Sequence, residues 1–169
     1  MIQIDRREQK NQHIEKRFDE LGVQYYGFSL PVGDYAVMND HHISVDKKGG
    51  LQEVYSNIVQ QHDRFMNECR LAKEAGIKLI ILIEEDGVHS LDEVCSWKNP
   101  RRVEWENIEE AHRQGRMLGV KNRARPPMNS LALASAMRTI ANETGVEWRF
   151  TTHERIAEDI LDLLGVETK

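Results

Sequence analysis

Hydrophobic residues recur along the chain with two different spacings. Ile2 and Ile4 alternate with polar residues, which predicts a first strand that ends at Asp5. From about residue 12 to Gly22 the apolar positions follow the helical repeat instead, and Gly22 is suited to end a helix. The chain is therefore expected to open with a strand and a helix.

The same two spacings predict the elements that follow. In chain order these are strands over 23–30, 31–38 and 43–46, a helix over 51–74, a strand over 77–83, helices over 105–118 and 130–144, a strand over 146–150 and a helix over 154–164. Strands that alternate with helices favour a mixed sheet between helices. We therefore expect an α/β fold of three layers, α-β-α, with a mixed central sheet.

The length of 169 residues suits one domain over residues 1–169. Residues 86–127 form its least regular part and are predicted to be an insert. The longest apolar run, 77–83, is interrupted by Lys78, so no segment is expected to cross a membrane. The start of the chain has no apolar signal-peptide segment, and its cysteines make no zinc-binding spacing. We expect a cytoplasmic protein in a reducing compartment.

The net charge of −5 argues mildly against a protein that coats nucleic acid, because such affinity comes mostly from basic groups. The average hides a local asymmetry, however, since basic residues crowd one stretch. These residues are Lys98, Arg101, Arg102, Arg113, Arg116, Lys121, Arg123 and Arg125. A basic stripe on an acidic domain is compatible with contact to DNA.

Two acidic positions near a predicted hairpin carry the strongest chemical signal. Residues two apart on a strand share one side, so Ile43 and Val45 are expected to face the core while Asp46 and Lys48 face the other way. Pairing with the preceding strand would bring Asp34 beside Asp46. Two carboxylates and a lysine in this arrangement can hold a divalent metal and activate a water for hydrolysis.

Magnesium suits such a site, because it keeps several waters and takes one or two carboxylates, leaving room for substrate phosphate oxygens. Lys48 would orient the water, help to deprotonate it, or neutralise the phosphorane. The alternative is that Asp34 and Asp46 are ordinary turn and strand-end residues beside solvated lysines. For a short isolated pattern that alternative is favoured, but the position of this pattern on a hairpin before a long helix favours a metal-dependent nuclease.

Five segments in order resemble the nuclease domain of the XPF-type structure-specific endonucleases, the ERCC4-domain family, in the short stand-alone form often encoded by phages. They are Ile4-Asp5-Arg6-Arg7-Glu8, Val32-Gly33-Asp34-Tyr35, Asp46-Lys47-Lys48, Gln61-His62-Asp63-Arg64-Phe65 and the stretch from Phe150 to Ala157. The resemblance covers nearly the whole chain apart from about 86–127. A phage-encoded form would act in the host-cell cytoplasm.

This resemblance implies a restriction-endonuclease-like fold and a Mg²⁺- or Mn²⁺-dependent endonuclease. Its substrate would be branched or flapped DNA, or a junction of single and double strands, as in repair or recombination. The implied roles are metal binding by Asp34, Asp46 and the Lys47 carbonyl, catalysis by Lys48, and a place at the site's border for Asp5, near the metals, and Arg7, towards phosphate.

The sequence also departs from the family pattern. Asp46 stands where the family has a longer glutamate, and Lys47 replaces an arginine, which loses bidentate phosphate geometry. Gln52 stands at an expected acidic position, with Glu53 next to it, so the number of metals stays open. The DNA-binding helix-hairpin-helix tail of many relatives is absent. Gln52 in place of an acid and the shortened Asp46 support an alternative, a catalytically inactive DNA-binding or scaffold protein of the same fold.

Weaker signals suggest further contacts. The predicted DNA-binding residues are Lys47, Arg64, Trp97, Lys98, Arg101 and Arg102. Trp97 would stack on an unpaired base while its basic neighbours hold phosphates, and the alternative is a tryptophan packed under a surface loop. Glu84 would reach the metal from the side, and the alternative is a solvated acidic turn.

Relatives act as dimers, so the resemblance also implies a homodimer. The apolar stripes of the last two predicted helices, 130–144 and 154–164, offer a surface for it. The alternative is that Ile160 and Leu164 face the protein's own core.

Overall fold

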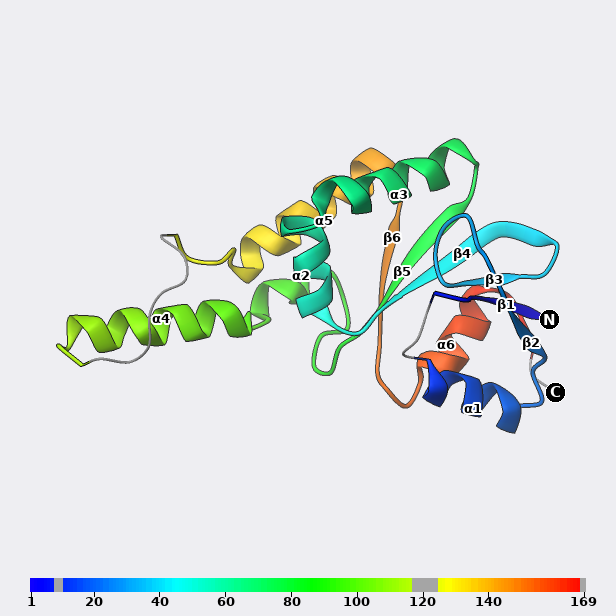
Figure 1. Cartoon of the computed structure of the whole chain (residues 1–169), viewed down its shortest axis with the longest axis horizontal. Helices are drawn as coiled ribbons and strands as arrows, with labels where there is room; N and C mark the ends of the chain where they lie inside the picture. Colours follow the sequence, from blue (N-terminus) through cyan, green and yellow to red (C-terminus); the bar gives the residue numbers. More distant parts are fainter. Residues whose placement is uncertain (8–10, 117–124, 168–169) are drawn as a thin grey trace.

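The computed structural model describes residues 1–7, 11–116 and 125–167, which form a mixed six-stranded sheet covered by helices (Figure 1). The elements are β1 (Ile2–Asp5), α1 (Gln12–Glu20), β2 (Tyr25–Phe28), β3 (Tyr35–Val37), β4 (Asp40–Lys48), α2 (Leu51–Val59), α3 (His62–Glu74), β5 (Lys78–Glu84), the 3-10 helix η1 (Glu93–Ser96), α4 (Pro100–Arg113), α5 (Ser130–Thr144), β6 (Glu147–Thr151) and α6 (Ile156–Leu163). The strand order is β2-β1-β3-β4-β5-β6. β3 runs antiparallel to β1 and β4, and the other neighbouring pairs are parallel.

Each face of the sheet builds its own hydrophobic core. Ile81 and Ile83 of β5 pack with apolar residues of α2, α3 and α5. Ile80 and Leu82 point the other way and pack with α1 and α6. This alternation follows from the two-residue period of a strand. The predicted α-β-α layering is therefore confirmed.

The predicted helix over 51–74 is divided into α2 and α3. α2 ends at Val59, and the amides of Gln60 and Gln61 both donate to the Ser56 carbonyl. Leu51 of α2 and Phe65 of α3 both lie in the core that covers one sheet face. A break between the helices lets both apolar faces reach that core, which one straight helix would not allow.

α4 begins earlier than predicted because the chain supplies a helix start at residues 99–101. The Asn99 side chain accepts a hydrogen bond from the Arg101 amide, and Pro100 occupies the first turn. The helix extends away from the sheet (Figure 1) and buries only Ala111 among its described residues. Lys121 and Arg123 of the predicted basic stretch lie outside the described residues. The assignment of 86–127 as an insert within one domain stays a prediction.

Neither α4 nor any other helix within the described ranges has the length and apolar character needed to cross a membrane.

The predicted dimer surface is wrong, because its two helices lie on opposite sides of the sheet. α5 packs with α2 and α3, whereas α6 packs with α1. Ile160 and Leu164 are buried in the latter core. The apolar stripes thus serve the protein's own interior, and homodimerisation stays a prediction without an assigned surface.

Gly33 allows the close approach of the segment before β3 to β4. Its φ of 70° is unfavourable for other residues. A Cβ at this position would collide with the Ser44 hydroxyl and lie 3.1 Å from the Val45 carbonyl oxygen. The Ser44 hydroxyl has little freedom to move, because it donates to the Val32 carbonyl at 2.8 Å.

We predict that Gly33→Ala lowers the free energy of unfolding by about 2–4 kcal/mol, from left-handed backbone strain together with overpacking. Gly22→Ala is the matched control, because Gly22 has a φ of 67° but open space around its missing Cβ. That control should lose only the strain, about 1–2 kcal/mol. Denaturant unfolding of the two variants checks the difference, and equal losses would contradict the proposed close approach.

Candidate active site

β4 carries Asp46 and Lys48 to the sheet face that α2 and α3 cover. In the parallel pairing with β5, Asp46 lies opposite Ile81 and Lys48 opposite Ile83, and both isoleucines belong to the core on that face. Val45 points to the other core. The alternation predicted from the sequence is confirmed, although Asp46 and Lys48 are buried rather than solvated.

Asp34 is held beside Asp46 by the pairing of its own backbone with β4. The Asp34 amide donates to the Val45 carbonyl at 2.8 Å. In the reverse direction, the Lys47 amide donates to the Asp34 carboxylate at 2.8 Å. The two carboxyl groups lie close enough for each to shift the pKa of the other. The structure therefore brings the predicted pair together.

Burial and mutual repulsion shape the charges of this group. Burial, followed by the charge of Asp46, raises the pKa of Asp34 to about 9. Burial also raises the pKa of Asp46, which lies 2.7 Å from the Lys48 ammonium. Burial is the largest influence on Lys48 and acts to lower its pKa. The charge and hydrogen bond of Asp46, together with the nearby acidic groups Asp34 and Glu53, outweigh burial and the pKa is raised. Lys48 is therefore charged at neutral pH, and Asp34 holds a proton there.

The donor set fits a hard divalent cation. Asp34 and Asp46 offer carboxylate oxygens, the ligands that Mg²⁺ and Mn²⁺ prefer. Apart from its ion pair with Lys48, the buried Oδ2 of Asp46 has no hydrogen-bond partner among the described residues. A cation would displace the proton on Asp34 and offset the repulsion between the carboxylates.

A pocket of about 420 Å³ opens over the carboxylates. Arg64 and Glu68 of α3 line it together with Asp34, Asp46 and Lys48. Sequence reasoning missed Glu68, which accepts from the Gly33 amide at 3.2 Å and acts to raise the pKa of Asp46. Its position four residues after Arg64, one helical turn on, could have indicated that both face the site.

A larger pocket of about 730 Å³ adjoins the first and shares Lys48, Glu53 and Arg64 with it. Gln52 and Asn57 of α2 line this second pocket, and each has a buried amide atom without a hydrogen-bond partner among the described residues. Glu53, rather than Gln52, also lines the carboxylate pocket. The acidic side chain expected on α2 is therefore present one position later.

Asp5 and Arg7 lie at the border of the site, as predicted. The Asp5 carboxylate is 2% exposed and accepts from the Arg7 amide, Nε and Nη2, and from the Leu30 amide. The hydrogen bonds from Arg7 lower the pKa of Asp5 to about 2. Asp5 is thus engaged in holding the guanidinium of Arg7, which is 73% exposed at the pocket edge.

Three of the other predicted DNA contacts, Trp97, Arg101 and Arg102, are half-buried, and the fourth, Lys98, is exposed. Trp97 packs against the core of α2, α3 and α5, so the packed alternative is confirmed. The Arg101 guanidinium lies 5.8 Å from the centre of an aromatic ring on α2. Arg102 is 2.7 Å from Glu106 in an ion pair.

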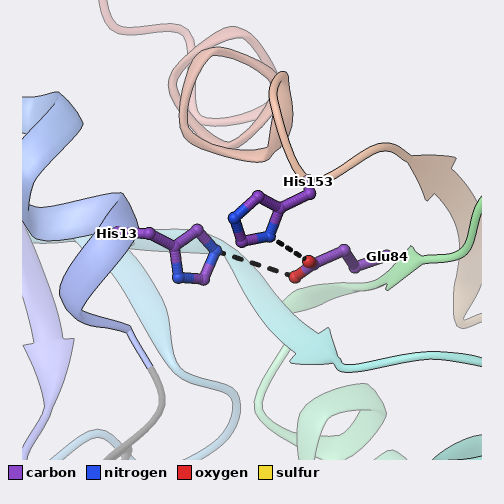
Figure 2. A group of neighbouring side chains, drawn as sticks. All are labelled: His13, Glu84 and His153. Carbon is purple, nitrogen blue, oxygen red and sulfur yellow. Dashed lines mark hydrogen bonds and ion pairs between the residues drawn. The ribbon is translucent and has the colours of Figure 1, made fainter.

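The strand positions of Lys47 and Glu84 direct their side chains to the opposite face of the sheet, although Lys47 also lines the carboxylate pocket. Lys47 is 8% exposed and lies opposite Leu82, a residue of the α1/α6 core. Glu84, two positions after Leu82, contacts His13 and His153 (Figure 2). The prediction that Glu84 reaches the carboxylate site from the side is wrong, because its strand position directs it to the opposite face.

Comparison with known proteins agrees with this architecture. The ERCC4 domain family model matches residues 4–162, and no curated protein matches the chain. A structure of XPF from Aeropyrum pernix has a TM-score of 0.62 and 20% identity, covering 98% of this chain and 65% of that one. XPF from Aeropyrum pernix in complex with DNA has a TM-score of 0.60 and 18% identity, covering 97% and 62%. The predicted restriction-endonuclease-like fold is confirmed, and the chain spans slightly less than two thirds of these relatives.

We predict that, in the presence of a chelator, the protein loses stability as the pH rises. The pKa of Asp34 is about 9 in the folded protein against an ordinary value of 3.8. Between these values the folded state binds more protons than the unfolded state, so the free energy of unfolding falls with increasing pH. Asp34→Asn should flatten this slope and unfold at higher denaturant than the wild type near pH 8.

Denaturant unfolding at several pH values measures this effect. Asp40→Asn is a suitable control, because Asp40 is exposed. A wild-type stability that rises from pH 5 to pH 8 would contradict the protonated state of Asp34.

Proposed function

Because the chain belongs to the ERCC4 domain family, we propose that it is a metal-dependent DNA endonuclease that hydrolyses phosphodiester bonds in the carboxylate pocket. The observation that carries the proposal is the group formed by half-buried Asp34 with buried Asp46 and Lys48 on one sheet face. Burying two carboxyl groups side by side costs free energy, and metal binding at a catalytic centre explains why the chain accepts that cost.

Asp34 and Asp46, with the Lys47 carbonyl, would hold Mg²⁺ or Mn²⁺. The bound ion would acidify the attacking water and offset the charge of the transition state. The Lys48 ammonium lies 2.7 Å from Asp46, which raises its pKa, and as an ammonium it would orient the water or neutralise the phosphorane. The product would carry a 5′-phosphate.

Arg7 and Arg64 would bind the phosphates that flank the scissile bond. Both line the two adjoining pockets, and Asp5 holds Arg7 in place by a bidentate ion pair. The pocket beside Arg64 that Gln52 and Asn57 line has room for one DNA strand that separates from a duplex at the site. This supports branched or flapped DNA as the substrate, and the relative solved in complex with DNA supports DNA as the polymer.

The inactive-scaffold alternative loses part of its support. It rested on Gln52 at an acidic position, but Glu53 and Glu68 both line the carboxylate pocket. A chain that keeps this many acidic groups around a buried carboxylate pair is better explained by metal-dependent catalysis.

We predict that Asp34→Asn and Asp46→Asn each lower cleavage of a labelled flap or junction by at least about a hundredfold, because each removes a metal-binding charge that stabilises the transition state. Asp86→Asn, a change at an exposed turn residue, should cleave like the wild type. The measurement is the metal-dependent cleavage rate on branched, single-stranded and duplex DNA, and a reaction with chelator serves as the blank. Binding to DNA without any metal-dependent product from the wild type would favour the scaffold alternative.

We also predict that Arg64→Ala weakens DNA binding about equally across sequences and reduces the slope of log K against log salt by about 0.9 for each phosphate that the variant no longer neutralises. Arg70→Ala is the matched control, because Arg70 is exposed on the same helix and hydrogen-bonds Asn67. Affinity is measured over a salt series with calcium in place of magnesium. An unchanged slope in Arg64→Ala would exclude this arginine as a phosphate ligand.

A further inference from the structure

Three potential metal ligands meet on the face of the sheet opposite the carboxylate pocket. His13 comes from α1, Glu84 from the end of β5, and His153 from the turn before α6 (Figure 2). One ligand atom from each residue lies within 4.8 Å of the others. Segments far apart in the sequence are thus brought to one point at the carboxyl end of β5.

The arrangement of the two imidazoles is unusual for a simple hydrogen-bonded cluster. Their rings are stacked, with centroids 4.3 Å apart and planes 20° from parallel. Glu84 lies between their nitrogens, 2.6 Å from His153 Nδ1 and 3.7 Å from His13 Nε2. His13 Nε2 is buried and has no hydrogen-bond partner among the described residues. One imidazole nitrogen thus points at the carboxylate without a bond to it.

These distances are close to those around a bound transition metal. Bonds of 2.0–2.1 Å in a tetrahedral site place ligand atoms about 3.3 Å apart. The carboxylate would move slightly away from His153 and towards His13 to reach that spacing. His153 can adapt, because its side chain is 63% exposed. Burial lowers the pKa of His13, which favours the neutral ring that binds metals.

We propose that His13, Glu84 and His153 form a second metal site, which takes a borderline transition ion such as Zn²⁺. Two imidazoles and one carboxylate are a donor set for zinc, with water in the remaining position. The carboxylate pocket offers oxygen ligands alone and so suits Mg²⁺ or Mn²⁺. The two sites thus select different ions on opposite faces of the sheet.

The bound ion would tie three elements of one layer together. α1 and α6 otherwise meet the sheet through the apolar core of Ile14, Phe18, Ile156 and Ile160. A metal at the His13–Glu84–His153 site adds a polar link at the edge of this core, between the first helix of the chain and the last. The proposed effect is structural, and it does not depend on nuclease activity.

Zinc titration of the chelator-treated full chain tests the site. The background is Asp46→Asn, which removes the competing carboxylate site. In this background one Zn²⁺ should bind per chain, measured by calorimetry, and Zn²⁺ at about a hundred times its Kd should raise the Tm by about 5–10 °C. Adding His153→Ala should weaken zinc binding by about a hundredfold or more and remove the rise in Tm.

Two further variants make the result specific. Glu84→Gln keeps the shape of the side chain and should also lose zinc binding. His89→Ala removes another exposed histidine and should bind one Zn²⁺ as the background does. Circular dichroism of the zinc-free variants checks that each is folded.

The proposal is overturned if the Asp46→Asn background binds no zinc, or if His153→Ala and Glu84→Gln bind it as tightly as His89→Ala. Because zinc binding is measured without DNA, these outcomes are independent of whether the chain cleaves a substrate. Loss of cleavage in the carboxylate variants with an intact zinc site, or the reverse, separates the two proposals.

Discussion

The close placement of two carboxyl groups, one buried and one half-buried, is the constraint around which this structure is arranged. Asp34 and Asp46 cannot both be charged in a poorly solvated position without a cation. Lys48 supplies one positive charge from the same strand, at 2.7 Å from Asp46. The backbone amide of Lys47 stabilises Asp34, and Gly33 gives its loop the space to reach β4. The negative charge that is left is neutralised by a proton on Asp34, and a divalent cation would replace this proton.

The alternation of the central strands separates two kinds of chemistry. Along β4 and β5, neighbouring residues point to opposite layers, so Asp46 and Lys48 face α2 and α3 while Glu84 faces α1 and α6. The first layer then collects carboxylates and arginines, and the second collects two histidines around one carboxylate. A shift of either strand by one residue would exchange these surroundings. Strand register therefore determines which potential metal ligands each side of the sheet presents.

The features that the sequence predicted correctly are those set by the repeat of a single strand or by residues close together in the chain. Strand alternation placed Asp46 and Lys48 on one side, and the hairpin brought Asp34 to them, because both follow from the two-residue period. Glu68 and Glu84 were misjudged because their neighbours are determined by helix orientation and by strand order, which involve contacts distant in sequence. The break between α2 and α3 was missed for the same reason, since it serves the packing of both helices on one sheet face. Trp97 could not be assigned from sequence, because an aromatic beside basic residues fits a packed loop as well as a binding loop.

How this acidic chain would hold DNA, as we propose, depends on which basic side chains are not engaged within the protein. The predicted basic stripe is partly engaged within the protein, since Arg102 pairs with Glu106 and Arg113 pairs with Glu110. Such exposed pairs add little stability, but they reduce the positive electrostatic potential with which the basic stretch attracts a phosphate backbone. Arg7 is held differently, because Asp5 binds one edge of its guanidinium while most of the side chain stays exposed. Attraction to nucleic acid would therefore be concentrated at the pocket, where the bound cation would add its own charge. A weakly attractive surface elsewhere would leave the contacts at the pocket to decide where the chain stops on DNA.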